Sequence, residues 1–194
     1  MSRMIRALVL CVFAASCGGT DRTPPRDLDN ACSIVDERPH LLRAMRKTEK
    51  RWGVPVAVQM ATLYQESKFI GNARTPMKFA LGVIPMGRQS SAYGYSQALD
   101  GTWDEYRQKT GNWRAKRDRI RDASDFMGWY MDGTSRSLGI SRQDARNQYL
   151  AYHEGRTGYR RGSYREKDWL VRVSGNVATR AQKYHAQLLA CRKL

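Results

Sequence analysis

One carboxylate stands apart from the other acidic residues of the sequence. Glu66 closes an apolar segment in which Val56, Met60 and Leu63 recur at helical spacing, so it falls on the flank of a buried stripe. The C-terminal end of a helix favours cations, and an acid there is electrostatically unfavourable unless it serves chemistry. Partial burial would raise the pKa of this carboxyl group and keep it a proton donor near neutral pH. Glu66 is therefore the candidate general acid, and the alternative is a solvated surface residue.

Three short segments that follow one another along the chain resemble motifs of a known family. Residues 66–69 read E-S-K-F, residues 94–97 read G-Y-S-Q, and residues 151–155 read A-Y-H-E-G. Their order is similar to that of the soluble lytic transglycosylase family. In that family an E-S-x-F segment holds the catalytic glutamate, a G-L-M-Q segment lines the glycan groove, and an A-Y-N-A-G segment brings a tyrosine beside the glutamate. The resemblance covers roughly residues 52–158.

The resemblance assigns roles residue by residue. Glu66 takes the catalytic match, and the substrate-binding matches are Ser67, Tyr95, Gln97, Tyr152 and His153. The second segment keeps only the first and last residues of its pattern, and in the third a histidine and a glutamate replace Asn and Ala. The stretch between Glu66 and Gly94 is also longer than in the family pattern. Gln97 and Tyr152 are therefore the better supported of the glycan contacts.

The resemblance also implies a fold, a reaction and a substrate. The fold would be lysozyme-like and helical. The reaction would cleave the bond between N-acetylmuramic acid and N-acetylglucosamine in the glycan strands of peptidoglycan and form a 1,6-anhydromuramoyl product. A single carboxylate suffices for it, because the substrate's own N-acetyl group can stabilise the cationic intermediate. No cofactor is implied, and the sequence shows no convincing His, Cys and Asp cluster for a metal.

Three rival functions remain open at this point. A hydrolytic muramidase would need a second carboxylate, and Glu154 is its strongest candidate, ahead of Asp100, Asp104 and Glu105. A non-catalytic, lipid-anchored peptidoglycan-binding module is compatible with the altered second and third segments. The formal charge of +16 would also suit nucleic acid, with its densest cluster between residues 114 and 121. We expect no nucleic-acid partner, because the chain carries an export signal and the anionic cell wall explains the charge.

The first residues predict export and a lipid anchor. Arg3 and Arg6 precede a short apolar stretch, which is typical of a secretory signal over residues 1–16 and too short to span a bilayer. The segment ends A-A-S-C-G and resembles a bacterial lipobox, which makes Cys17 the expected lipidation site; ordinary cleavage after small residues is the alternative. Residues 17–31 would then form a flexible tether. We expect a periplasm-facing location in the bacterial cell envelope, with the chain anchored to the outer membrane.

The two remaining cysteines of the mature chain lie at the ends of the expected domain. Cys11 leaves with the signal and Cys17 would carry lipid, so only Cys32 and Cys191 can pair. In an oxidising compartment they would join the start of the domain to its end, whereas the alternative is two buried free thiols.

The elements that must position these residues are helical. The chain has 194 residues, and we expect one monomeric all-α domain over residues 32–194 with a long loop beside the cleft. Asp36 is the expected cap of a helix ending at Gly53, Pro55 opens the helix that carries Glu66, and the Ser141 capping box opens the helix that carries Tyr152. The loop over residues 71–94 has hairpin character in part. Aromatic residues at helical spacing, including Trp103, Phe126, Trp129 and Trp169, are expected in the core.

Overall fold

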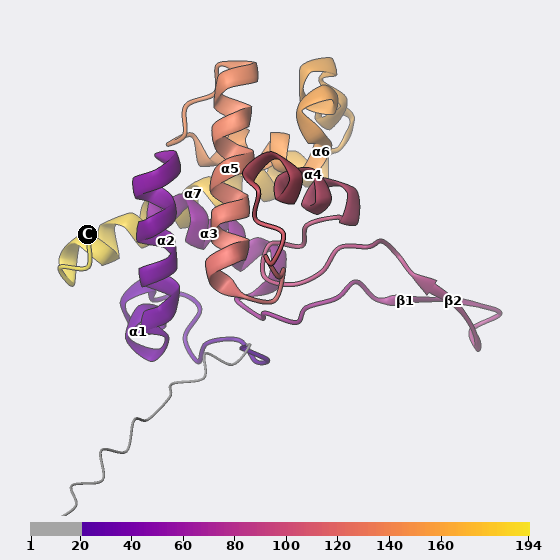
Figure 1. The fold of residues 1–194 in the computed structure, drawn as a ribbon, viewed down its shortest axis with the longest axis horizontal. Coiled ribbons are helices and arrows are strands. Elements are labelled where there is room, and N and C mark those ends of the chain that lie inside the picture. The colour runs from indigo at the N-terminus through magenta and orange to yellow at the C-terminus, as the bar shows by residue number, and fades with distance from the viewer. Residues whose placement is uncertain (1–20) are drawn as a thin grey trace, which may run out of the picture.

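The computed structural model describes residues 21–194, and helices make up most of it (Figure 1). The helices are α1 (Ala31–Glu37), α2 (Pro39–Trp52), α3 (Val56–Ser67), α4 (Asp100–Thr110), α5 (Ile120–Leu138), α6 (Ala145–Arg161) and α7 (Asp168–Ala190). One turn of 3-10 helix, Ser163–Glu166, precedes α7. The described part of the chain has one sheet, formed by the antiparallel strands β1 (Met77–Ala80) and β2 (Ile84–Arg88). The expected all-α class is confirmed.

Helix α3 lies at the centre of the domain. It packs against α2, α5, α6 and α7, and every residue from Val56 to Leu63 is buried. A helix that is buried on all sides needs apolar or small side chains around its circumference, and this segment supplies them except at Gln59, whose amide donates to the carbonyls of Met45 and Val54. Its last turn, which carries Glu66, therefore emerges from a low-dielectric interior rather than from a solvated helix face.

Two helix starts differ from the expectation. Asp36 lies inside α1, whose N-cap is Asn30, and α2 begins separately at Pro39. The Ser141 capping box is also wrong, because α6 begins one turn later, where the side chain of Asp144 accepts the N–H of Asn147 at 3.0 Å. Ser141 instead accepts the N–H of Gln143, a local turn that competes with helix initiation.

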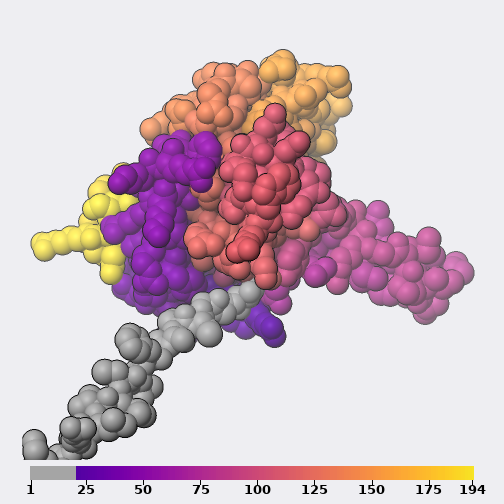
Figure 2. Space-filling view, in the orientation of Figure 1, coloured from indigo at the N-terminus to yellow at the C-terminus, as the bar shows by residue number. Residues whose placement is uncertain are grey.

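The long loop between α3 and α4 extends away from the helical body. Its strands pair Phe79 with Pro85 and Ala80 with Ile84, so the hairpin character expected for part of this loop is confirmed. Figures 1 and 2 show the hairpin as a projecting arm. Every residue of β2 is exposed, and no helix packs on either strand.

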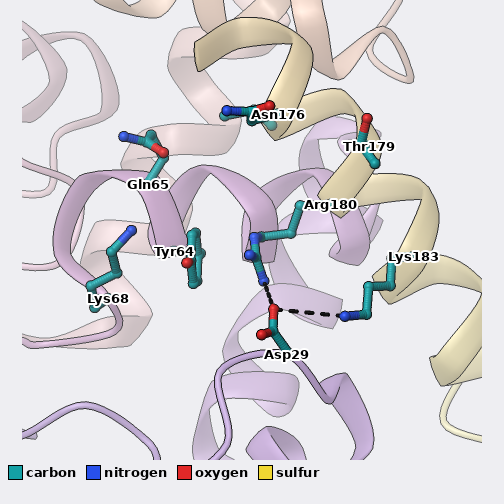
Figure 3. Close-up of a pocket in the computed structure, with 9 residues that line it drawn as sticks. Asp29, Tyr64, Gln65, Lys68, Asn176, Thr179, Arg180 and Lys183 are labelled. Carbon is teal, nitrogen blue, oxygen red and sulfur yellow. Dashed lines mark hydrogen bonds and ion pairs between the residues drawn. The ribbon is translucent and has the colours of Figure 1, made fainter. Parts of the chain in front are cut away.

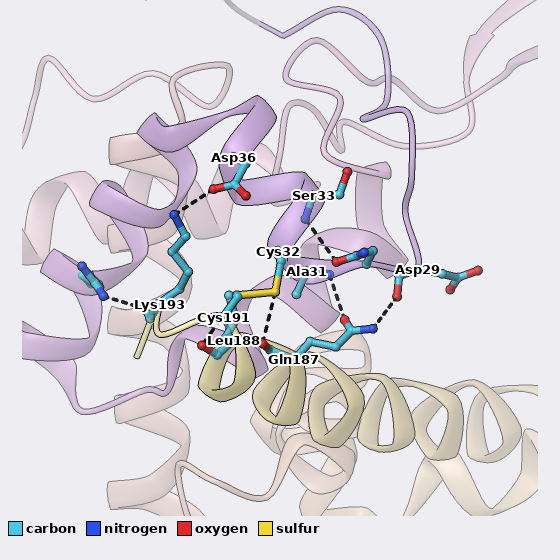
Figure 4. Close-up of a disulfide and its surroundings, with 11 residues drawn as sticks. Asp29, Ala31, Cys32, Ser33, Asp36, Gln187, Leu188, Cys191 and Lys193 are labelled. Carbon is cyan, nitrogen blue, oxygen red and sulfur yellow. Dashed lines mark hydrogen bonds and ion pairs between the residues drawn. A yellow bond between two sulfur atoms is a disulfide. The ribbon is translucent and has the colours of Figure 1, made fainter.

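The expected disulfide joins the two ends of the domain (Figure 4). Cys32 in α1 is bonded to Cys191 at the end of α7, with 6.4 Å between their Cα atoms. The side chain of Gln187 also accepts the N–H of Ala31 at 2.8 Å, and Lys193 pairs with Asp36 at 2.8 Å. These contacts attach α1 to α7 with covalent, polar and ionic links.

Residues 21–30 lie against the domain, so the flexible tether expected over residues 17–31 is wrong for this part. The Asp21 carboxylate accepts a 2.7 Å hydrogen bond from Tyr95, and its backbone carbonyl accepts the N–H of Gly71. Farther along, Arg180 and Tyr184 of α7 both donate to the carbonyl of Leu28. Among the described residues, the buried core begins at Ala31 and ends at Leu188, and the disulfide joins the first and last helices that contribute to it.

Two further expectations concern residues outside the core. Trp169 is 49% exposed, so its expected core position is wrong, because it lies on the outer face of the first turn of α7, where Leu170 takes the buried position. Its ring lies against His153 at a centroid distance of 5.2 Å.

Within residues 21–194, no helix has the length and apolar composition that crossing a membrane requires. The proposed signal segment and Cys17 lie outside the described residues.

Candidate active site

Helix α3 ends in a sharp left-handed turn directly after Glu66. Lys68 and Phe69 have φ values of 52° and 62°, a region that side chains other than glycine rarely adopt. The N–H of Lys68 still bonds to the carbonyl of Tyr64, and the Phe69 ring is fully buried. Burial of that ring offsets the backbone strain, which is common at functional sites. The turn therefore fixes where α3 ends and holds Glu66 in the last turn of the helix, at the edge of the core.

The carboxyl group of Glu66 is largely removed from water. Burial raises its pKa to about 7, while a hydrogen bond from Tyr149 and the positive charge of Lys68 lower it in part. The desolvation effect wins because the two opposing contacts replace only part of the lost hydration. At neutral pH the group therefore exists in comparable amounts as acid and as carboxylate, which suits a residue that donates and then accepts a proton.

Helix α6 brings two tyrosines to this carboxyl group. Tyr149 lies close enough to Glu66 for its hydroxyl to lower the pKa of the carboxyl group, and burial together with the Glu66 charge raises the pKa of the Tyr149 phenol. Tyr152 is three residues farther along the same helix face, and burial and then the Glu66 charge raise its pKa well above the ordinary value. The prediction that Tyr152 lies beside Glu66 is thus supported. Tyr149 was missed as a site residue, although its spacing from Tyr152 could have revealed it.

Tyr152 also connects the third motif to the second. Its hydroxyl donates a 2.7 Å hydrogen bond to the carbonyl of Ser96. Gly94, two residues earlier, has a φ of 80°, and a Cβ there would lie 2.2 Å from the carbonyl oxygen of Arg117. Only glycine allows this close approach. The second motif therefore packs tightly between Arg117 and the tyrosine that stands near Glu66.

Gln97 holds the backbone of this loop. Its φ of 47° is again left-handed, and its side-chain amide donates to the carbonyls of Ala73 and Gly94 at 3.0 and 2.8 Å. Both amide hydrogens are committed to these bonds. The side-chain oxygen of Gln97 is the atom that remains for a glycan hydroxyl.

The other predicted contact residues occupy different environments. Tyr95, a predicted substrate contact, is only 1% exposed and its hydroxyl donates to Asp21, so in this structure its ring is buried and offers no face to a sugar. Ser67 is buried and donates to the carbonyl of Leu63, which gives it a role within the helix. His153 is exposed and contacts Glu154 and Trp169.

Glu154 is committed to structural contacts. Its side chain is 5% exposed, it pairs with Lys167 at 2.8 Å, and it accepts a hydrogen bond from Ser163. These hydrogen bonds and the Lys167 charge outweigh burial and lower its pKa to about 2. A fully engaged carboxylate is a poor base or nucleophile. The other acids considered for hydrolysis lie at the surface: Asp100 pairs with Arg117, Asp104 pairs with Arg107, and Glu105 is exposed.

A polar cavity of about 420 Å³ opens between the end of α3 and α7, next to Glu66 in sequence (Figure 3). The cations Lys68 and Arg180 flank the ring of Tyr64, at 3.6 and 3.4 Å from its centroid. Arg180 and Lys183 also pair with Asp29, whereas the structure gives Lys68 no carboxylate partner among the described residues. Lys68 therefore lines this cavity and contributes positive charge near Glu66.

The cluster of Glu66, Tyr149 and Tyr152 on crossing helices agrees with a family-level comparison. A family model described as a transglycosylase SLT domain matches residues 5–191 of the sequence. The chain belongs to this family. Its members are peptidoglycan lytic transglycosylases, which are glycan lyases acting on peptidoglycan strands, and the family suggests a periplasmic cell-wall enzyme. A comparison with curated proteins finds no match. Among residues 21–194, no group of three or more His, Cys, Asp or Glu side chains is placed to hold a metal ion.

Proposed function

We propose that this transglycosylase uses Glu66 as its only acid and base and releases 1,6-anhydromuramoyl ends. The observation that carries the proposal is the Glu66 carboxyl group, held by α3 against two α6 tyrosines with its pKa raised to about 7. Protonated Glu66 donates to the glycosidic oxygen as the bond to C1 breaks. The substrate's N-acetyl oxygen bonds to C1 and stabilises the positive charge.

The second half of the reaction uses the same carboxylate. Glu66 accepts the proton of the muramoyl 6-hydroxyl as that oxygen bonds to C1 and displaces the N-acetyl oxygen. Water takes no part as a nucleophile, and the site returns to its starting protonation state. The engagement of Glu154 with Lys167 and Ser163 supports a one-carboxylate reaction over hydrolysis by a pair.

Glu66→Gln is the direct test of this role. The variant keeps the side-chain volume but can neither donate nor accept the required proton, so turnover of purified sacculi is expected to fall by about 10²- to 10⁴-fold. Co-sedimentation with sacculi should remain close to that of the wild-type protein. Glu105→Gln, at an exposed carboxylate, is the matched control and should keep full activity. Full activity of Glu66→Gln would contradict the proposal and favour the non-catalytic binding module.

We also propose that the mature chain is a monomer anchored by lipid on Cys17 to the periplasmic side of the outer membrane. The lipobox-like sequence before Gly18 supports the anchor, and only three residues lie between Cys17 and Asp21, which contacts the domain. Labelled palmitate should enter the wild-type chain in cells and not Cys17→Ser. Equal labelling of both would contradict the anchor.

A further inference from the structure

The projecting hairpin carries an apolar surface that the glycan reaction does not use. Residues 79–87 read F-A-L-G-V-I-P-M-G, nine residues without a polar or charged side chain. Leu81 is 90% exposed, Val83 76% and Met86 64%. Figure 2 shows this segment standing clear of the helical body. A cluster of exposed large apolar side chains this size marks an interaction surface.

Both faces of the hairpin are apolar. Successive side chains of a strand point to opposite faces, so the pair Phe79 and Pro85 lies on one face and the pair Ala80 and Ile84 on the other. A hairpin that docks into a protein groove needs only one apolar face and keeps the other polar. An apolar medium that surrounds the tip matches both faces at once. Phe79 is the one aromatic ring of the segment, which makes a stacking surface for sugars a poor fit.

Basic residues surround the root of this apolar tip. Lys78 and Arg88 flank the segment directly, and Arg74 and Arg88 line a cavity of about 310 Å³ at the hairpin base. From Ser67 to Leu99 the chain has no Asp or Glu. An apolar end bordered by cations is complementary to a bilayer surface, where acyl chains lie below anionic phosphates.

The described chain starts beside the root of the same hairpin. The backbone carbonyl of Asp21 accepts the N–H of Gly71, six residues before β1. The residues from Cys17 to Asp21 can span at most about 14 Å, so a lipid on Cys17 would hold this edge of the domain close to the membrane. A hairpin that grows from that edge can reach the same bilayer.

We propose that the tip of the hairpin, residues 79–87, inserts into the surface of an anionic phospholipid bilayer. Insertion is shallow, because the strands have unpaired backbone groups along their outer edges that must stay near water. Lys78 and Arg88 remain at the phosphate level. The insertion gives the enzyme a second membrane contact and holds its orientation there, independently of a lipid on Cys17.

The test uses residues 18–194, which lack the lipidation site and contain the core of the described residues and the disulfide. It is mixed with vesicles of phosphatidylethanolamine and phosphatidylglycerol, and bound protein is measured by co-sedimentation. The double variant Leu81→Ser with Val83→Ser should bind at least about tenfold more weakly, because two exposed apolar side chains no longer leave water. The double variant Leu189→Ser with Leu194→Ser changes exposed apolar residues elsewhere and should bind like the wild type.

The depth of insertion is measured on the Leu81→Cys variant of residues 18–194. Its new thiol is the only free one in that stretch, because Cys32 and Cys191 form the disulfide. A fluorophore attached there should be quenched by lipids brominated in the acyl chains, and one on Arg161→Cys at the end of α6 should not. Melting temperatures should match among variants, because the tip packs on nothing. Equal vesicle binding by the hairpin variant would show attraction by charge alone and overturn the proposal. The proposal would also be overturned if the wild-type protein did not bind the vesicles, or if the hairpin variant differed from the wild type only in self-association. None of these readouts depends on glycan cleavage.

Discussion

The hydroxyl of Tyr152 donates a hydrogen bond to the carbonyl of Ser96, at 2.7 Å, and thereby joins α6 to the loop before α4. The same ring is close enough to Glu66 for the carboxylate charge to raise the pKa of its phenol. One side chain thus links the second motif to the carboxyl group of Glu66. This link explains how three segments separated by many residues form one site.

Tyr152→Phe should loosen that link. The Ser96 carbonyl loses its donor inside the protein, so the free energy of unfolding should fall by about 1 to 3 kcal/mol in urea denaturation. Turnover of sacculi should fall as well, because the loop and Glu66 lose their fixed spacing. Tyr159→Phe is the control, since it loses a comparable bond to Asn147 away from Glu66. If both variants lost activity equally, the Tyr152 bond would have only a structural role.

Glu66→Gln should stabilise the protein, and the gain should depend on pH. The pKa of Glu66 is about 7 in the folded state against 4.5 for an ordinary glutamate side chain, so between these values the folded chain binds more protons than the unfolded chain. Wild-type stability contributed by Glu66 is therefore lost as pH rises through this window. At a pH of about 8 the variant should be more stable by roughly 1 to 3 kcal/mol, and below about 4.5 the two should be similar. A variant that is less stable at the higher pH would show that Glu66 is well solvated.

Lys68→Met should move the pH dependence of turnover. Lys68 favours the ionised form of Glu66, so its removal raises the pKa of Glu66 and keeps the acid form to higher pH. The alkaline decline in turnover, which we expect near pH 7 for the wild type, should shift to higher pH in sacculus digestion measured across pH. Lys183→Met removes a charge from the same cavity but not one that acts on Glu66, and it should leave the profile in place. An unchanged profile in Lys68→Met would mean that Glu66 does not set the alkaline limb.

Glu154→Gln separates the one-carboxylate reaction from hydrolysis by two carboxylates. The variant loses its ion pair with Lys167, so it should be less stable, while turnover should stay within about threefold of the wild type. Glu154→Ala would additionally remove packing and serves as the more disruptive comparison. A loss of turnover by 10²-fold or more in a folded Glu154→Gln protein would indicate a second catalytic carboxylate.

The sequence predicted the helices that carry Glu66 and Tyr152 because their apolar periodicity is strong, and it predicted the disulfide because only two cysteines remained. It could not predict that Tyr95 is buried while Tyr149 reaches Glu66. Both are tyrosines in polar segments, and only the path of the loop through Gly94 and the angle between α3 and α6 decide which ring faces the carboxyl group.

Helix starts were missed for a related reason. Asp36 and Ser141 are good caps by type, yet Asp36 lies within α1, α2 begins at Pro39 without a side-chain cap, and Asp144 caps α6 in place of Ser141. The left-handed turn at Lys68 and Phe69 was likewise invisible in the sequence, since neither residue favours it and burial of the Phe69 ring enforces it.

The central claim is that Glu66 alone shuttles one proton while the substrate closes on itself, and mass spectrometry of fragments released from sacculi tests it most directly. The account predicts that wild-type protein releases fragments with anhydro ends, lighter by one water molecule than hydrolysed ends, and that Glu66→Gln releases neither in quantity. Fragments with reducing ends alone would contradict the account.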